Sequence, residues 1–207
     1  SNHMSLFETV LNSEGYKGVY LKETNYLTVE TGLKYVNNDA CYPALIVTGQ
    51  LIQALQSGKY DLNNTSVMIT QTGGGCRATN YIGLIRKALA DAGFSNVPVI
   101  SLNFSGLEKE QAFKFTVPLL NKVLQAVVYG DLLAKLLYAT RPYEVKKGSS
   151  IRLYNKWMKK CNESLKKGVI SEYKNNIREI VNDFKKVPVL FINKPKVGIV
   201  GEILIKY

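Results

Sequence analysis

Apolar positions along the chain follow two spacings, and the changes between them predict the order of helices and strands. Four short runs rich in β-branched or aromatic residues are typical of strands: 18–21, 26–29, 66–70 and 97–102. Two other segments, 44–55 and 82–89, have apolar residues at helical spacing. Because a glycine-rich loop, a helix and a strand follow 66–70 in that order, the pattern predicts a βαβ unit with parallel strands.

The second half of the sequence is mainly helical by the same criterion. A long apolar segment from Thr116 to about Tyr138 predicts one helix, with Pro118 in its first turn. Two amphipathic stripes separated by Gly168 predict an antiparallel helical pair, and the apolar runs 187–192 and 197–205 predict two closing strands. The expected fold class is therefore α/β: a small Rossmann-like, doubly wound, mostly parallel sheet with an appended helical region.

These elements divide the sequence into four expected segments. Residues 1–4, Ser-Asn-His-Met, are typical of an expression scar. Residues 5–112 form an α/β domain that carries cysteines, and residues 113–186 form a helical region. Residues 187–207 provide the closing strands and begin a second α/β unit that is truncated after Tyr207.

Composition restricts the chemistry of the chain. His3 is the single histidine and lies in the expected scar, so mechanisms that depend on histidine are nearly excluded. No uncharged apolar run of about 18 residues is present, so we expect no membrane association. Three widely spaced cysteines indicate thiols or cluster ligands in a reducing compartment, and we expect a cytoplasmic protein.

Positive charge is concentrated in the second half. The formal net charge is +11, and between Arg141 and Lys196 fifteen Lys or Arg face five Asp or Glu, a net of +10. Such basic helices can bind nucleic acid or an acidic partner. However, no nucleic-acid motif accompanies the charge, so a solvated lysine-rich surface is favoured and we do not expect nucleic-acid binding.

The glycine loop after the strand 66–70 is the strongest candidate for chemistry. It reads Gln71-Thr72-Gly73-Gly74-Gly75-Cys76-Arg77 and precedes a predicted helix. Amide groups at a helix N-terminus favour the thiolate of Cys76, and Arg77 adds positive charge. The glycines allow close approach of a ligand, so phosphate or other anion binding is the alternative. A dinucleotide site is disfavoured because the next strand ends in Ser101-Leu102-Asn103, without the expected acidic residue.

The other two cysteines differ in their predicted surroundings. Cys41 precedes Pro43 at a predicted helix start, the same setting as Cys76, but the spacing of 35 residues alone is a weak indication of a shared cluster. Cys161 lies on an apolar helical stripe between Trp157 and Leu165, which favours a small buried hydrophobe.

Several motifs together resemble the 2-hydroxyacyl-CoA dehydratase superfamily. They are NDACYPALIVTGQLIQAL, QTGGGCRATNYIGLIRKALADAGF, VPVISLN, VYGDLL, RPYE and KVGIVGEILIKY. More closely, they resemble the dehydratase-like region of the large acyl-CoA dehydratase activase-related proteins of anaerobic bacteria. The resemblance extends from about Asn37 to Tyr207, and QTGGGCRATNY is its most specific part.

The resemblance implies a [4Fe-4S] cluster held by cysteines near a CoA-thioester cleft, with an ATP-dependent activator as electron donor. It assigns cluster ligation to Cys41 and Cys76 and places Gln71, Thr72, Gly73, Gly74, Gly75, Arg77 and Asn80 at the cleft. A third protein ligand is not located, since Cys161 is poorly placed on its apolar helical stripe, and the activator's nucleotide-binding motifs are missing from the chain. We therefore expect an iron–sulfur, electron-accepting part of a dehydratase-like lyase or its activase system, inactive without the rest of the parent polypeptide. A cluster-free module for phosphate or CoA-type anions and a basic interaction domain are the alternatives.

Overall fold

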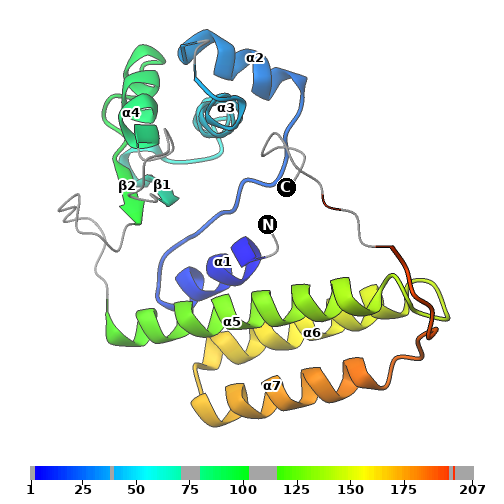
Figure 1. Ribbon diagram of the computed structural model, residues 1–207. Coiled ribbons are helices and arrows are strands. Elements are labelled where there is room, and N and C mark those ends of the chain that lie inside the picture. The colour runs from blue at the N-terminus through cyan, green and yellow to red at the C-terminus, as the bar shows by residue number, and fades with distance from the viewer. Residues whose placement is uncertain (1–2, 38–39, 71–79, 103–115, 196–197, 199–207) are drawn as a thin grey trace. The chain divides into compact units, whose positions relative to one another are not determined.

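The computed structural model describes residues 3–37, 40–70, 80–102, 116–195 and 198 (Figure 1). The chain divides into two compact units. The first, termed the sheet unit, consists of residues 21–114. The second, termed the helical unit, combines residues 1–20 with residues 115–207.

The sheet unit contains the βαβ arrangement that the sequence predicts. Its elements are α2 (Tyr26–Tyr35), α3 (Tyr42–Gln56), the 3₁₀ turn η1 (Leu62–Asn64), β1 (Val67–Thr70), α4 (Tyr81–Asp91) and β2 (Val99–Leu102). Strands β1 and β2 pair in parallel, with Val67 opposite Val99 and Thr70 opposite Leu102. The predicted parallel pairing of these two segments is therefore confirmed.

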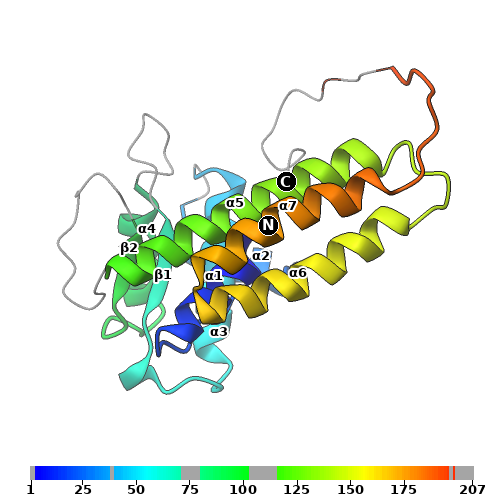
Figure 2. The same ribbon diagram turned by 90° about the horizontal axis from the view of Figure 1, so that it is seen from below.

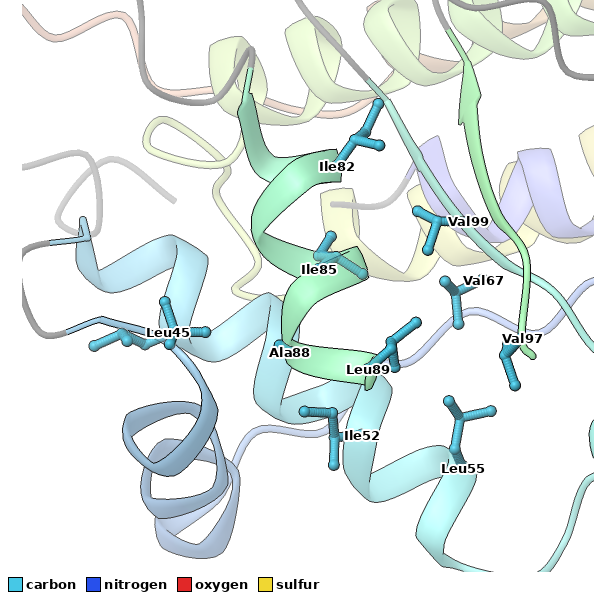
Figure 3. Packing of buried hydrophobic residues seen from close by; sticks show 11 residues of the cluster. Leu45, Ile52, Leu55, Val67, Ile82, Ile85, Ala88, Leu89, Val97 and Val99 are labelled. Atoms are coloured by element: carbon cyan, nitrogen blue, oxygen red, sulfur yellow. The ribbon is translucent and has the colours of Figure 1, made fainter. Parts of the chain in front are cut away.

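The core of the sheet unit lies between α4, α3 and the two strands. Figure 3 shows Ile82, Ile85 and Leu89 on the face of α4 directed toward valines of the strands. Ile52 and Leu55 of α3 extend this buried cluster. The apolar spacing in both helices therefore identifies the face that is buried away from water. The burial of this apolar face is the main stabilising contribution to such a packing.

Helices α2 and α3 cross at very short distance because glycines lie at the crossing. A methyl group on Gly32 would overlap the carbonyl oxygen of Leu45, and one on Gly49 would overlap the carbonyl oxygen of Thr28. The buried hydroxyl of Thr28 donates to Oε1 of Gln53 over 2.7 Å, which joins the two helices by a polar contact as well. This close packing fixes the orientation of α3 relative to α2.

The helical unit consists of α1 (His3–Ser13), α5 (Val117–Thr140), α6 (Ser149–Lys167) and α7 (Ile170–Lys185), which pack side by side (Figure 2). Thr116 caps α5 by accepting a hydrogen bond from the amide of Leu119. Gly168, at a φ of +69°, ends α6 and reverses the chain. Helices α6 and α7 are antiparallel, as predicted, with Lys160 opposite Glu179 and Lys167 opposite Glu172.

Polar side chains join the helices of this unit in its interior. The hydroxyl of Tyr129 lies 3.2 Å from the hydroxyl of Ser164 and accepts a hydrogen bond from the Asn176 amide over 3.0 Å. All three residues are buried, so the network connects α5, α6 and α7. Lys122 of α5 pairs with Glu14, which immediately follows α1, at 2.8 Å.

The predicted Rossmann-like, doubly wound sheet is wrong. The described residues are mostly helical and contain a single two-stranded parallel sheet. Residues 26–29, predicted as a strand, form the first turn of α2, because Asn25 and Thr28 make a capping box. Residues 187–192 form no strand and contribute only one isolated bridge, between Glu144 and Val189. The predicted strand 18–21 is irregular, and 197–205 lies outside the described residues apart from Gly198.

Helix α1 concerns the expected expression scar, and helix α5 concerns the expectation of no membrane association. His3 and Met4 of the expected scar belong to α1, and His3 Nε2 lies 3.0 Å from Asp131 Oδ1 of α5. Helix α5 is long and apolar enough to cross a membrane by length and composition, a criterion that the core helix of a soluble protein also meets. In this structure α5 packs against α1, α6 and α7.

Candidate site at the N-termini of α3 and α4

The sheet unit brings strand ends and helix starts to one edge of its small sheet. Because β1 and β2 are parallel, their carboxyl ends, Thr70 and Leu102, lie at the same edge. Figure 3 shows α4 running opposite to β2, with Ile82 beside Val99, so α4 begins at that edge. Ligands of α/β proteins commonly bind at the carboxyl ends of parallel strands.

Cys41 lies at the start of α3 and is in contact with the start of α4. Its thiol sulfur is 2.7 Å from the hydroxyl oxygen of Tyr81, the first residue of α4, and either group can donate the hydrogen bond. The two helix N-termini are therefore separated by no more than one cysteine and one tyrosine side chain. The thiol is half-buried, so it is accessible from the surface of this unit.

Neither N-cap residue closes its helix N-terminus with its own side chain. Cys41 is the N-cap residue of α3 and Asn80 that of α4, and neither side chain accepts a capping hydrogen bond. Pro43 in the first turn of α3 has no amide hydrogen to satisfy. The first-turn amides that remain, together with the two helix dipoles, make this edge favourable for a negatively charged group.

The structure places two of the predicted site residues at this edge. Cys41 starts α3, and Asn80 is exposed immediately before α4. The remaining predicted residues, Gln71, Thr72, Gly73, Gly74, Gly75, Cys76 and Arg77, lie outside the described residues. Tyr81 was not predicted as a site residue, since its aromatic ring could equally have belonged to the apolar face of α4.

Cys161 differs from Cys41 in how deeply it is buried. It is fully buried between the helices of the helical unit, and this burial raises the pKa of its thiol to about 12. A thiol with such a pKa stays protonated at neutral pH, whereas a metal ligand or nucleophile must be a thiolate. The prediction that Cys161 is a small buried hydrophobe is confirmed.

The acidic residue of the RPYE motif has a structural role. The carboxylate of Glu144 accepts hydrogen bonds from the amides of Gly148 and Ser150, over 2.5 and 2.7 Å. The proximity of Ser150, and then the hydrogen bond from the Gly148 amide, lower the pKa of Glu144. Glu144 therefore caps α6, which begins at Ser149, and the motif is a charge-stabilised helix start.

A metal site complete within the described residues is not present. No group of three or more His, Cys, Asp or Glu side chains in this part of the chain could hold a metal ion. A cluster on Cys41 would therefore require Cys76 and further ligands from outside the residues that the structure describes. The surroundings of Cys41, a sulfur beside the Tyr81 hydroxyl and two helix N-termini, are compatible with a role as one ligand of such a cluster.

No family model, curated protein or solved structure matches this chain. An assignment of function therefore depends on the sequence motifs and on the geometry at the edge of the sheet.

Proposed function

We propose that the chain is part of a 2-hydroxyacyl-CoA dehydratase or activase-related protein, and that its sheet unit contributes Cys41 and Cys76 to an iron–sulfur cluster. The cluster would accept an electron from an ATP-dependent activator, near a cleft for a CoA thioester. The proposal rests on the motifs around Cys41 and Cys76, since their resemblance to the dehydratases is what suggests a cluster.

One structural observation supports this proposal. The sulfur of Cys41 lies at the N-terminus of α3 and 2.7 Å from the hydroxyl of Tyr81, at the start of the helix that follows the Cys76 loop in sequence. Thiolate clusters carry net negative charge, and amide donors, hydroxyl donors and helix dipoles stabilise that charge. The residues present around Cys41 thus fit a cluster ligand better than a buried structural thiol such as Cys161.

Anaerobic reconstitution with iron and sulfide tests the assignment. The test uses the proposed parent polypeptide, because a third protein ligand is not located among the described residues of this chain. We expect cysteine-dependent iron, measured by metal analysis and by EPR after reduction, that is lost in Cys41→Ser and in Cys76→Ser. Iron binding that persists in both variants would contradict the proposal.

Cys161→Ala is the matched control for these variants. It removes one thiol, but a thiol that is buried in the helical unit and protonated at neutral pH. We expect its iron content and EPR spectrum to equal those of the wild type. Equal loss of iron in all three variants would show a nonspecific thiol effect and count against a defined cluster.

A second candidate function is the binding of a phosphate or CoA-type anion without a cluster. Its support is that neither N-cap residue at the carboxyl edge caps its helix with its own side chain. Calorimetric titration with inorganic phosphate and with coenzyme A separates the two functions. For a binding module, Cys76→Ser leaves the affinity unchanged, whereas Gly74→Val abolishes it because a glycine backbone is needed for close approach.

A further inference from the structure

Helix α6 presents a continuous basic face to solvent. Its cations are Arg152, Lys156, Lys159, Lys160, Lys166 and Lys167. At 3.6 residues per turn the six positions fall within about a third of the helix circumference, so they lie on one side of the helix, along about 22 Å at 1.5 Å per residue. The opposite side, with Trp157, Cys161 and Leu165, is buried in the helical unit.

The basic face is only partly neutralised within the helical unit. Lys160 pairs with Glu179 at 2.7 Å and Lys167 with Glu172 at 3.4 Å, both across to α7. The four other cations of the face have no carboxylate partner among the described residues. A shallow depression of about 490 Å³ lies along the same face, lined by Arg152, Asn155, Lys156, Lys159, Lys160 and Glu163.

We propose that this basic face of α6 is a docking surface for an acidic face of a protein partner. A partner that aligns several carboxylates with the unpaired lysines gains from charge complementarity, which speeds association and fixes orientation. This proposal concerns the helical unit and does not depend on the iron–sulfur cluster proposed for the sheet unit. Either proposal can therefore be wrong while the other is right.

The distribution of acidic residues favours a protein over a nucleic acid. Glu163 is exposed within the basic face, and Glu172 and Glu179 border it on α7. These carboxylates would repel a uniform phosphate backbone, whereas a protein partner can place its own cation against Glu163.

The amino-acid composition of the face also favours a protein partner over a nucleic acid. Arg152 is its single arginine, although arginine is the residue best suited to bind phosphate through two parallel hydrogen bonds. Trp157, the aromatic residue nearest the centre of the helix, is 2% exposed and cannot stack on a base.

The test uses the 207-residue chain and a fluorescent 20-residue helical peptide with glutamates at i, i+4 and i+7 along one side. A 20-base-pair DNA duplex is the competing probe. We expect peptide binding at 50 mM salt that weakens at 300 mM, because salt screens exposed charges. We also expect shifts of backbone amide resonances confined to α6 and its border with α7.

Charge reversal locates the surface. Lys156→Glu with Lys159→Glu places repulsion at the centre of the face, and we expect peptide affinity to fall about tenfold. The matched control, Lys174→Glu with Arg178→Glu, makes the same change in net charge on α7. Helical geometry puts Lys174 and Arg178 on a different side of α7 from Glu172 and Glu179, so we expect less than a twofold effect.

Three results would overturn the proposal. One is an absence of peptide binding at 50 mM salt. Another is an equal loss of affinity in both double variants, which would show an effect of net charge alone. The third is binding of the DNA duplex more tightly than the peptide at 150 mM salt with loss in Lys156→Glu/Lys159→Glu, which would identify the face as a nucleic-acid surface.

Discussion

Gly49 of α3 lies directly against the backbone of Thr28 in α2, with no room for a methyl group between them. The neighbouring contact of Gly32 with Leu45 has the same character, so two glycines, one from each helix, form the crossing. The side chain of Thr28 uses this proximity to reach Gln53. The orientation of α3, and with it the position of Cys41 at its N-terminus, therefore depends on glycine at these positions.

Gly49→Ala should destabilise the sheet unit. The new methyl group meets a backbone carbonyl that cannot rotate away, so the helices must separate, and overpacking of this kind costs about 2 kcal/mol or more. Thermal unfolding followed by circular dichroism measures the loss. Gly83→Ala is the matched control, because among the described residues its methyl group meets only the Asn80 side chain. The change also replaces a glycine, which weakens a helix, at an exposed position. Equal melting temperatures for Gly49→Ala and the wild type would contradict the close packing.

Local sequence signals were sufficient for the βαβ arrangement but not for α2. The runs that became β1, α4 and β2 are apolar, correctly spaced and adjacent in sequence, so their pairing depends mainly on local pattern. Residues 26–29 have aromatic and β-branched side chains typical of a strand, yet the Asn25–Thr28 capping box starts a helix there. The capping signal was present in the sequence, and the β-propensity of the run concealed it.

The lack of a larger sheet among the described residues has a different origin. A strand is stable only when a neighbouring strand satisfies its backbone groups, and that partner is distant in sequence. Residues 187–192 are apolar enough for a strand but find one bridging partner, at Glu144. For the same reason, the contact between Cys41 and Tyr81 spans 40 residues and follows from the packing of α3 against α4, which no local pattern reveals.

The two described cysteines should differ in reactivity toward a thiol reagent. In a Cys76→Ser background, Cys41 and Cys161 remain, and only Cys41 is accessible in the folded chain. We expect one equivalent of thiol to react with Ellman's reagent at pH 8 under native conditions and a second only after unfolding. Mass spectrometry of the peptides identifies the site, and rapid native labelling of Cys161 would show that the helical unit is not packed as described.

The buried Cys161 should make the helical unit sensitive to alkali. Its pKa is about 12 in the folded chain and 9.0 for an unperturbed thiol, so above pH 9 the unfolded chain loses a proton that the folded chain retains. Stability contributed by the protonated thiol is thus complete below pH 9 and declines as pH rises toward 12. Relative to Cys161→Ala, the wild type should lose about 1 kcal/mol of unfolding free energy between pH 9 and pH 10.

Urea denaturation at these two pH values measures this difference, with the fluorescence of Trp157 as a probe located in the helical unit. Burial also raises the pKa values of Tyr129 and Tyr173. The contribution of Tyr173 cancels in the comparison, whereas that of Tyr129 cancels only in part, because Cys161 also raises the pKa of Tyr129. A constant difference between the two proteins from pH 8 to pH 10 would show that the thiol ionises equally in both states.

Glu144 should make the same unit sensitive to acid. Hydrogen bonds from Ser150 and Gly148 hold the pKa of Glu144 below its ordinary value of 4.5. The stability that its carboxylate provides is therefore present above pH 4.5 and is lost as pH falls through the lowered pKa.

Glu144→Gln keeps the shape of the side chain but removes the charge, and we expect a melting temperature about 2–4 °C lower at pH 7. The deficit should shrink as pH falls below 4.5. If Glu144→Gln melts at the wild-type temperature at pH 7, the carboxylate does not stabilise the start of α6.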